Sequence, residues 1–320
     1  MPRIAFMAVL AALLSMSQAF AQAYPAKPIR LIVPYPPGGI DPYARVVGVP
    51  MTADLGQPIV IENRPGANGF IGSEATARSA PDGYTLAFAT SSTMVAGPFL
   101  SKTVPFDPVK DFTYVVPLFE ALMTLSVRSS LNVNSVQELV DYAKRNPGKL
   151  SYNSSGIGSV FHLNGEMFKM AMGADIVHVP YGGTGPMAAA FAAGQVEVSF
   201  PGVTNVRPFL AKGEVKVIAV LEPRRFAAMP NVPTLAETLP GFRKAPSWIG
   251  YLAPAGLPRP LVERINTSVN KAWNAPEVKK FFDDNGAMFI GGSADEFAAS
   301  VKRDIEVTAA LVKKIGIQPE

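Results

Sequence analysis

Short apolar segments rich in β-branched residues alternate with segments of helical periodicity along most of this chain of 320 residues. Ile29–Val33, Tyr84–Ala89 and Val215–Val220 are three of these apolar segments. Regular alternation of strands and helices is typical of sheets with many parallel strands and helices on their faces. The sequence therefore predicts an α/β fold. In open parallel sheets, ligands bind at the loops that follow the carboxyl ends of the strands.

The remaining expected elements follow the same pattern. The other expected strands are Pro58–Glu62, Phe112–Leu118, Leu122–Val127, Leu150–Asn153, Ile176–Val179, Val196–Phe200 and Trp248–Ala253. The expected helices are Pro42–Leu55, Asn68–Ser79, a short one after Ser91–Thr93, Ser135–Arg145, Ser159–Met172, Pro186–Ala193, Pro258–Asn274, Glu277–Asp284 and Ala294–Lys314. Pro50 should kink or restart the first of these helices, because proline lacks the backbone N–H that an interior position requires.

The N-terminus has the pattern of an export signal. Arg3 precedes an apolar stretch, Ile4–Met16, that is short for a membrane span. Ala21-Gln22-Ala23 is a typical cleavage site, and Ala19-Phe20-Ala21 is an alternative two residues earlier. We expect residues 1–23 to be a cleavable signal peptide and the mature protein to be periplasmic. An uncleaved N-terminal anchor is the other possibility.

Composition excludes several classes of function. The chain has no cysteine, which excludes disulfides, thiolate catalysis and cysteine-ligated zinc. The net charge of +4 comes without basic runs, which argues against binding to nucleic acid. A roughly 300-residue mature chain is compatible with two domains.

Four loops between an expected strand and an expected helix are rich in glycine, serine or threonine. They are PYPPGGID (Pro34–Asp41), ATSST (Ala89–Thr93), SSGIGS (Ser154–Ser159) and YGGTGP (Tyr181–Pro186). Backbone N–H groups at a helix N-terminus attract anions, and glycine lets an anion approach the backbone closely. Any one of these loops alone is compatible with an ordinary capped turn, but four in the same topological position favour an anion site.

Evidence for an enzyme is weaker. The sequence has no phosphate-binding P-loop, no complete dinucleotide fingerprint and no G-x-S-x-G nucleophile motif. The only histidines are His162 and His178. His162 and Glu166 could share a helix face, but this pair alone is a weak metal signal, and His178 fits a packed or hydrogen-bonded residue. Ser155 or Ser159 with His162 and a distant aspartate would make a triad, although nothing in the sequence places them together.

Several longer segments together resemble the Bug-type extracytoplasmic solute receptors, the substrate-binding components of tripartite tricarboxylate transporters. The resemblance covers essentially the whole mature chain. The segments that carry it are PIRLIVPYPPGGIDPYAR, Ile61–Leu86, PFDPVKDF (Pro105–Phe112), Ser154–Phe168, Val179–Val198, Arg224–Thr238 and Gly250–Asn266.

The resemblance implies a two-lobed clamshell of the periplasmic-binding-protein type, with mostly parallel sheets and two crossings between the lobes. Residues 24–124 and 246–320 would form the first lobe, and residues 125–245 the second. We expect the chain to cross outward near Leu122–Val127 and to return near Arg243–Gly250.

The resemblance also implies that a carboxylate or dicarboxylate is held between the lobes. The residues expected to bind it are Tyr35, Gly39, Ile40, Asp41, Ser91, Ser92, Ser155, Gly158, Ser159, Tyr181, Gly182, Thr184 and Gly185. Asp41 should act mainly as the N-cap of the following helix. Asn63 and Arg64 should brace a loop. No catalytic residue, cofactor or metal is expected.

Two departures from the family pattern concern specificity. Only Ile40 separates the glycine pair from Asp41, where such receptors usually have two residues, so the first loop is one residue short. Pro201 stands where an acidic residue is often found. An acidic group there could receive an amine, so its absence favours a plain or aromatic carboxylate over an amino acid.

The expected partners are a small carboxylate and either membrane transporter subunits or a sensor kinase, with the receptor itself a monomer. A carboxylate sensor and a periplasmic hydrolase are the alternative functions. The sequence does not separate transport from signalling.

Overall fold

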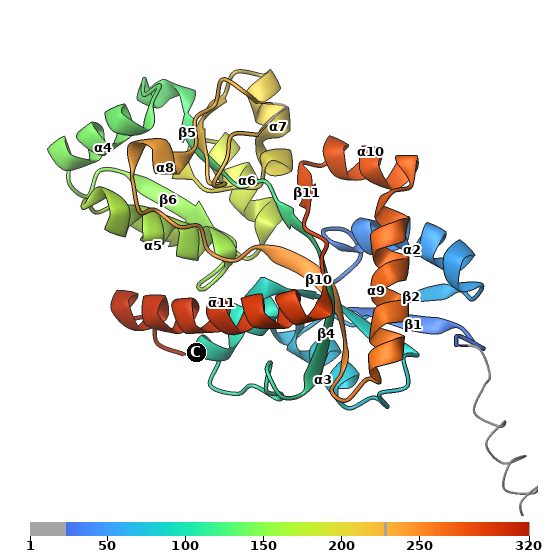
Figure 1. Ribbon diagram of the computed structural model, residues 1–320. Coiled ribbons are helices and arrows are strands. Elements are labelled where there is room, and N and C mark those ends of the chain that lie inside the picture. Colours follow the sequence, from blue (N-terminus) through green and yellow to red (C-terminus); the bar gives the residue numbers. More distant parts are fainter. Residues whose placement is uncertain (1–23, 227–228, 320) are drawn as a thin grey trace, which may run out of the picture.

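The computed structural model describes residues 24–226 and 229–319, which form two sheets with helices packed against them. The expected signal peptide, residues 1–23, lies outside the described residues. Figure 1 shows two lobes, one built mainly from the green and yellow middle of the chain and the other from its blue and orange-red ends. Among the described helices, none combines the length and the apolar character needed to cross a membrane.

The first lobe is built on a six-stranded sheet with the order β11-β4-β10-β3-β1-β2. Its strands are β1 (Ile29–Val33), β2 (Ile59–Asn63), β3 (Thr85–Thr90), β4 (Phe112–Ala121), β10 (Trp248–Pro254) and β11 (Ala287–Phe289). Strand β1 pairs in parallel with β2 and β3, whereas β10 runs antiparallel between β3 and β4. Strand β11 is antiparallel to β4 at the edge.

The second lobe is built on a five-stranded sheet with the order β7-β6-β8-β5-β9. Its strands are β5 (Thr124–Arg128), β6 (Ser151–Ser154), β7 (Val177–Pro180), β8 (Val198–Ser199) and β9 (Val215–Val220). Strand β6 is parallel to β7 and β8, and β5 is antiparallel to β8 and β9. The α/β fold is thus confirmed, with mixed sheets in which most strands run in one direction.

The helices lie close to their expected positions. The longer ones are α2 (Asp41–Leu55), α3 (Phe70–Ala77), α4 (Val136–Arg145), α5 (Val160–Met172), α6 (Thr184–Ala192), α7 (Val203–Ala211), α9 (Arg259–Trp273), α10 (Pro276–Asp284) and α11 (Ala294–Ile315). Shorter helical turns are η2 (Ala67–Gly69), η3 (Ser92–Ala96), η4 (Gly97–Phe99), η5 (Ser129–Leu131) and α8 (Leu235–Thr238). Helix α2 runs through Pro50 as one helix, so the expected restart there was wrong.

Each sheet has its own apolar core. Ile29, Phe88 and Tyr251 are fully buried in the first lobe, and Tyr152 and Phe168 are fully buried in the second. Burying side chains of this size is the main favourable contribution to folding. A smaller apolar cluster that includes Ala96, Leu163 and Leu311 joins the two lobes.

The chain passes between the sheets at two places that lie close together. It leaves the first sheet at the end of β4 and enters the second at Thr124, with Leu122 and Met123 between them. It returns after Phe242, whose side chain is buried in the core of the second lobe, and enters β10 at Trp248. The green and orange segments that join the lobes run through the centre of Figure 1.

Candidate functional site

The four glycine- and hydroxyl-rich loops occur as two neighbouring pairs. Strands β1 and β3 are adjacent and parallel, so the loops that follow them meet at one edge of the first sheet. Strands β6 and β7 are also adjacent and parallel, and the backbone N–H of Tyr181 donates to the carbonyl of Ser154 at 2.9 Å. Each lobe therefore brings two of these loops together at the carboxyl ends of its strands, where open parallel sheets bind ligands.

Tyr35 in the first loop turns its side chain inward. Its hydroxyl lies 2.8 Å from Oγ1 of Thr90 and 2.6 Å from Oγ1 of Thr93, which joins the loop after β1 to the loop after β3. Burial raises the pKa of Tyr35, so the phenol stays protonated. Tyr35 therefore supports the wall of the site, and its hydroxyl is already engaged.

The expected N-cap role of Asp41 was wrong. Ile40 occupies the N-cap position of α2, and Asp41 is the first residue inside the helix. Its carboxylate accepts from Nε of Arg45 at 2.7 Å and from Nδ2 of Asn63 at 2.8 Å. The bond from Arg45 holds the pKa of the Asp41 carboxyl below its usual range. Asp41 is 4% exposed, so it is an internal anchor for the loop rather than a surface for an anion.

The prediction that Asn63 braces a loop was confirmed. Its Nδ2 donates to the carbonyl of Tyr35 at 3.1 Å as well as to Asp41, which fixes both ends of the first loop. Between these ends, Gly38 and Gly39 have φ angles of 94° and 54°, a region that favours glycine. A Cβ atom at either glycine would meet nothing within 4 Å, so this part of the loop faces open space.

Ser91 and Ser92 follow β3 but differ in their surroundings. The buried Ser91 donates from Oγ to the carbonyl of Pro246 at 2.8 Å, which ties this loop to the returning crossing. Ser91 is at the N-cap position of the short turn η3 without a capping bond from its side chain, whereas Oγ1 of Thr90 accepts from the backbone N–H of Thr93 at 3.2 Å. Ser92 is half-buried, and among the described residues its hydroxyl has no hydrogen-bond partner.

In the second lobe, the loop Ser154–Ser159 is fixed from its inner side. Ser159 caps α5 by accepting at Oγ from the backbone N–H of His162 at 3.3 Å. The backbone N–H of Gly158 donates to Nδ1 of the same histidine at 2.9 Å. Ser155 is half-buried, and its hydroxyl has no partner within the described part of the chain. Its hydroxyl is therefore available for a further hydrogen bond.

The loop Tyr181–Pro186 is more open. Helix α6 begins at Thr184, two residues earlier than expected, so its N-terminal N–H groups come directly after Gly183. Gly182, Thr184 and Gly185 are exposed. A Cβ atom at Gly182 or Gly185 would have no heavy atom within 4 Å. Backbone N–H groups in the first turn of a helix have no partner within the helix, so this turn can receive an anion. Tyr181, by contrast, donates from its hydroxyl to Oε1 of Gln195 at 3.1 Å.

The two lobes touch beside these loops. A Cβ atom on Gly158 would come within 1.8 Å of Cδ1 of Leu100, which follows η4 in the first lobe. A small hollow of about 10 Å³ lies next to this contact, lined by residues of both lobes that include Ser91, Ser92 and Leu163. That volume is about one water-sized sphere. The hollow therefore lies where the two lobes touch, and it is too small to hold a dicarboxylate.

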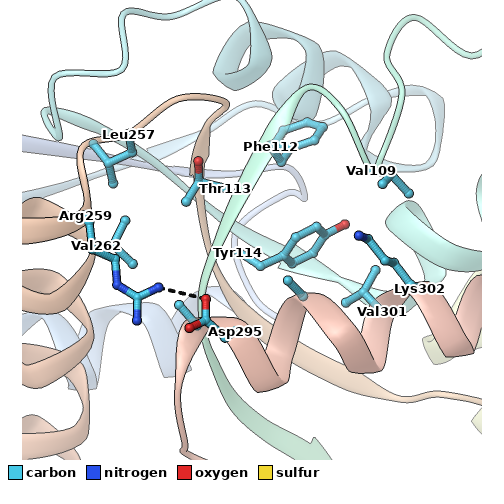
Figure 2. A pocket seen from close by; sticks show the side chains of 12 residues that line it. Val109, Phe112, Thr113, Tyr114, Leu257, Arg259, Val262, Asp295, Val301 and Lys302 are labelled. Carbon is cyan, nitrogen blue, oxygen red and sulfur yellow. Dashed lines mark hydrogen bonds and ion pairs between the residues drawn. The ribbon is translucent and has the colours of Figure 1, made fainter.

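A larger pocket of about 330 Å³ lies elsewhere in the first lobe, between β4, α9 and α11 (Figure 2). None of the predicted ligand residues lines it. Several of its polar groups already have partners: Arg259 donates to Asp295 at 2.7 Å, and the hydroxyl of Tyr114 donates to the carbonyl of Pro108 at 3.0 Å. This pocket has the size of a ligand site but presents few free polar groups that would orient a ligand.

The arrangement around the histidines does not form a catalytic triad. Nδ1 of His162 is taken by the N–H of Gly158, and the hydroxyl of Ser159 accepts from the backbone of α5. A second pair, Ser154 and His178, is joined at 2.7 Å between Oγ and Nε2, but Ser154 is fully buried. The described residues contain no cluster of three or more histidine or acidic side chains that could hold a metal ion. Through these hydrogen bonds, both serine–histidine pairs hold the backbone of the loop Ser154–Ser159 in place.

Comparison with known proteins identifies the family. A profile described as the tripartite tricarboxylate transporter family receptor (TctC) matches residues 43–317. The chain belongs to this family.

Individual TctC relatives agree with this assignment over nearly the whole chain. BugT of Bordetella pertussis is 33% identical, and the match covers 92% of this chain and 91% of BugT. An R. palustris protein solved with adipate is 33% identical with a TM-score of 0.81, covering 93% of this chain and 100% of that protein. MatC from Rhodopseudomonas palustris, solved with malate, is 31% identical with a TM-score of 0.76, covering 90% and 100%. The resemblance to Bug-type receptors is thereby confirmed, and this TctC receptor has the fold of periplasmic binding proteins.

Proposed function

We propose that this TctC receptor captures a small carboxylate or dicarboxylate in the periplasm and delivers it to a tripartite tricarboxylate-type membrane transporter. One observation carries the proposal. The exposed residues Thr184 and Gly185 in the first turn of α6, together with the exposed Gly182 just before its N-cap, lie beside the loop that carries the half-buried Ser155. Such a group of N–H and O–H donors, with no acidic side chain among those residues, fits a carboxylate.

The first lobe supplies the opposite side of the proposed site. Gly39 and Ile40 precede α2, and their backbone N–H groups have no hydrogen-bond partner in the described structure. Ser92 adds a hydroxyl from the neighbouring loop. A ligand that bridges both pairs of loops binds the closed arrangement of the lobes better than the open one. This difference in affinity shifts the population towards the closed form, which a membrane partner then recognises.

The relatives support the chemical class of the ligand. Adipate and malate, the ligands named for two of them, are dicarboxylates. The two lobes of this receptor give one pair of donor loops for each end of such a molecule. The hydroxyls of Ser91 and Tyr181 donate within the protein, and the hydroxyl oxygen of Ser159 caps α5. In our proposal these three residues therefore mainly shape the loops, while the ligand meets backbone N–H groups and the hydroxyls of Ser92 and Ser155.

A panel of carboxylates tests this function. Malate, adipate, benzoate and alanine are added to the mature protein, and the shift in melting temperature is followed by calorimetry of the compounds that stabilise it. We expect saturable stabilisation by at least one carboxylate, little effect of alanine, and no product when the mixture is analysed afterwards. Turnover of the compound would support the hydrolase alternative instead. The absence of binding across the whole panel would contradict the proposed function.

A second experiment distinguishes transport from sensing by identifying which partner protein responds to the ligand-bound receptor. Vesicles containing the membrane subunits encoded beside the gene should take up the labelled ligand only when the receptor is present. Uptake that does not require the receptor, together with ligand-dependent activation of a neighbouring sensor kinase, would favour signalling.

A further inference from the structure

The two histidines of the receptor form a stack on the inner side of the loop Ser154–Ser159. The ring centroids of His162 on α5 and His178 on β7 are 4.0 Å apart, and the ring planes differ by 12°. The ring of Tyr152 on β6 lies next to both imidazoles, with its centroid 4.9 Å from that of His178 and 6.5 Å from that of His162. His162 is 6% exposed. His178 is half-buried. Close stacking and burial of this degree favour the uncharged form of both rings.

Both rings hold the loop through hydrogen bonds. Nδ1 of His162 accepts from the backbone N–H of Gly158 at 2.9 Å. Nε2 of His178 lies 2.7 Å from Oγ of Ser154, which in turn lies 2.9 Å from the carbonyl of Gly156 and 3.1 Å from its N–H. The bond from Gly158 requires a lone pair on Nδ1, so the proton of the neutral ring is on Nε2. A protonated imidazole has two donors and no acceptor, and it would point an N–H at the N–H of Gly158.

The position of Gly158 matters because it is the part of this loop that touches the other lobe. It has a φ angle of 73°, and an added Cβ would overlap Leu100. The backbone of Gly158 is therefore held in one conformation by His162 on its inner side and by the first lobe on its outer side. A change at the histidine would be transmitted to the contact between lobes through a single residue.

Of the charged groups around the stack, Glu166 favours a proton on His178, but burial and the neighbouring positive groups outweigh it. Glu166 on α5 accepts from the hydroxyl of Tyr152 at 2.7 Å, and its charge is balanced by Lys169 at 3.1 Å. Lys169 also pairs with Asp175, which precedes β7, at 3.0 Å. Burial lowers the pKa of both histidines to about 4, with Lys169 adding to the effect at His162 and His162 adding to it at His178.

We propose that His162 is a positioning residue for ligand binding: its neutral ring holds Gly158 in the conformation that meets the first lobe, and protonation of the ring releases the loop. This inference rests on the proposed function, because it takes the loop Ser154–Ser159 as one side of the ligand site. The inference adds a coupling between protonation of His162 and binding of the ligand. Acid weakens carboxylate binding through a group that does not touch the carboxylate.

The first experiment needs no ligand. Because the full sequence contains two histidines, the untagged mature protein gives two imidazole signals in NMR spectra. The Cε1–H signal of His162 and the backbone amide signal of Gly158 are followed between pH 7.5 and 4. We expect both to titrate with the same midpoint. A Gly158 amide that stays constant while His162 titrates would overturn the proposal.

The second experiment compares two variants with the wild type, with adipate and malate as probes. His162→Asn places Oδ1 where Nδ1 was, so it keeps the acceptor but does not titrate. His162→Phe keeps a ring for the stack but removes the acceptor. At pH 7.5, we expect the Asn variant to bind within about threefold of the wild type, and the Phe variant to bind about tenfold more weakly, the cost of one lost hydrogen bond. Wild-type affinity in a folded Phe variant would refute the positioning role.

The pH dependence separates this role from a merely structural one. The ratio of the wild-type Kd to that of the Asn variant at each pH cancels the titration of the probe itself. We expect this ratio to rise about twofold by pH 4, where half of His162 carries a proton. By linkage, saturating probe should also lower the midpoint of the His162 signal. A constant ratio would overturn the proposal. If no carboxylate in the panel binds, the proposed function fails, and the ligand-free titration still decides whether His162 positions the loop.

Discussion

Nζ of Lys244 lies 2.5 Å from Oε2 of Glu222 and 2.7 Å from Oε2 of Glu120, at the place where the two crossings between lobes run side by side. Glu120 lies near the end of β4 and Glu222 just after β9, so the lysine joins the first sheet, the second sheet and the returning crossing. Glu222 also accepts from the backbone N–H of Met123 on the outward crossing at 3.3 Å. This ion cluster fixes the relative position of the segments about which the lobes would move.

Removing the lysine should destabilise the receptor. Glu222 is 3% exposed, and burial already raises the pKa of its carboxyl. In Lys244→Met, two carboxylates would remain close together without a cation, at a cost of about 3 kcal/mol in the free energy of unfolding. Urea denaturation measures this change. Lys280→Met is the matched control, because Lys280 and Asp284 form an exposed pair that should contribute much less to the free energy of unfolding. Equal effects of the two substitutions would show that the cluster does not hold the crossings.

Gly185→Asp should abolish carboxylate binding without unfolding the protein. The added side chain has space, since a Cβ at Gly185 meets nothing within 4 Å, but it places a negative charge at the N-terminus of α6. Repulsion of this kind costs several kcal/mol, which corresponds to at least a hundredfold rise in Kd. Gly185→Asn is the neutral control of nearly equal size and should lose much less affinity. Calorimetry with the Asp variant tests the assignment, and wild-type affinity there would contradict it.

Gly158→Ala should weaken ligand binding by obstructing the contact between lobes. Its Cβ would overlap Leu100, and alanine is also strained at a φ angle of 73°. Leu100→Ala removes the overlap but not the strain. We expect the double variant to recover part of the affinity lost in Gly158→Ala, and the double-mutant cycle gives the coupling energy directly. Additive effects on Kd would mean that this contact is not part of closure.

The free energy of unfolding should decrease as the pH falls from about 6.5 to about 4. Both histidines have a pKa of about 4 in the folded protein and about 6.5 when unfolded, so the unfolded chain binds more protons in this range. The stabilisation is complete above pH 6.5 and is lost by at most about 1.4 kcal/mol per pH unit for each histidine. Urea denaturation across this range measures the slope. A variant with both histidines replaced by asparagine should have a smaller slope, and an unchanged slope would contradict this origin.

Local sequence was sufficient where a segment's structure depends on its own residues. The predicted bounds of β1 (Ile29–Val33) and β9 (Val215–Val220) match the structure, because each is an apolar run with a single charged residue whose other side chains become largely buried. Helix α7 (Val203–Ala211) was not predicted, since Pro208 lies inside it and argues locally against a helix. Strand β11 (Ala287–Phe289) was also missed, because its three residues are strand only through pairing with β4.

In the candidate site, too, features that depend on residues distant in sequence could not be predicted. The four loops could be recognised by their glycines and hydroxyls, and their place after strands predicted that they meet at sheet edges. The residues that shape the loops could not be assigned in this way. Tyr35 depends on Thr90 and Thr93, far away in sequence, and Asp41 is an internal anchor only because β2 brings Asn63 beside it.

The sequence by itself determined the α/β fold, the family and the chemical class of the loops, since these depend on local periodicity and on residue types. The tertiary structure decided which polar groups are engaged within the protein. The histidine stack forms because the parallel register of β6 and β7 places His178 against α5, and Lys244 meets two carboxylates because the two crossings lie side by side. Such contacts join residues distant along the chain, and their geometry depends on how the two cores pack.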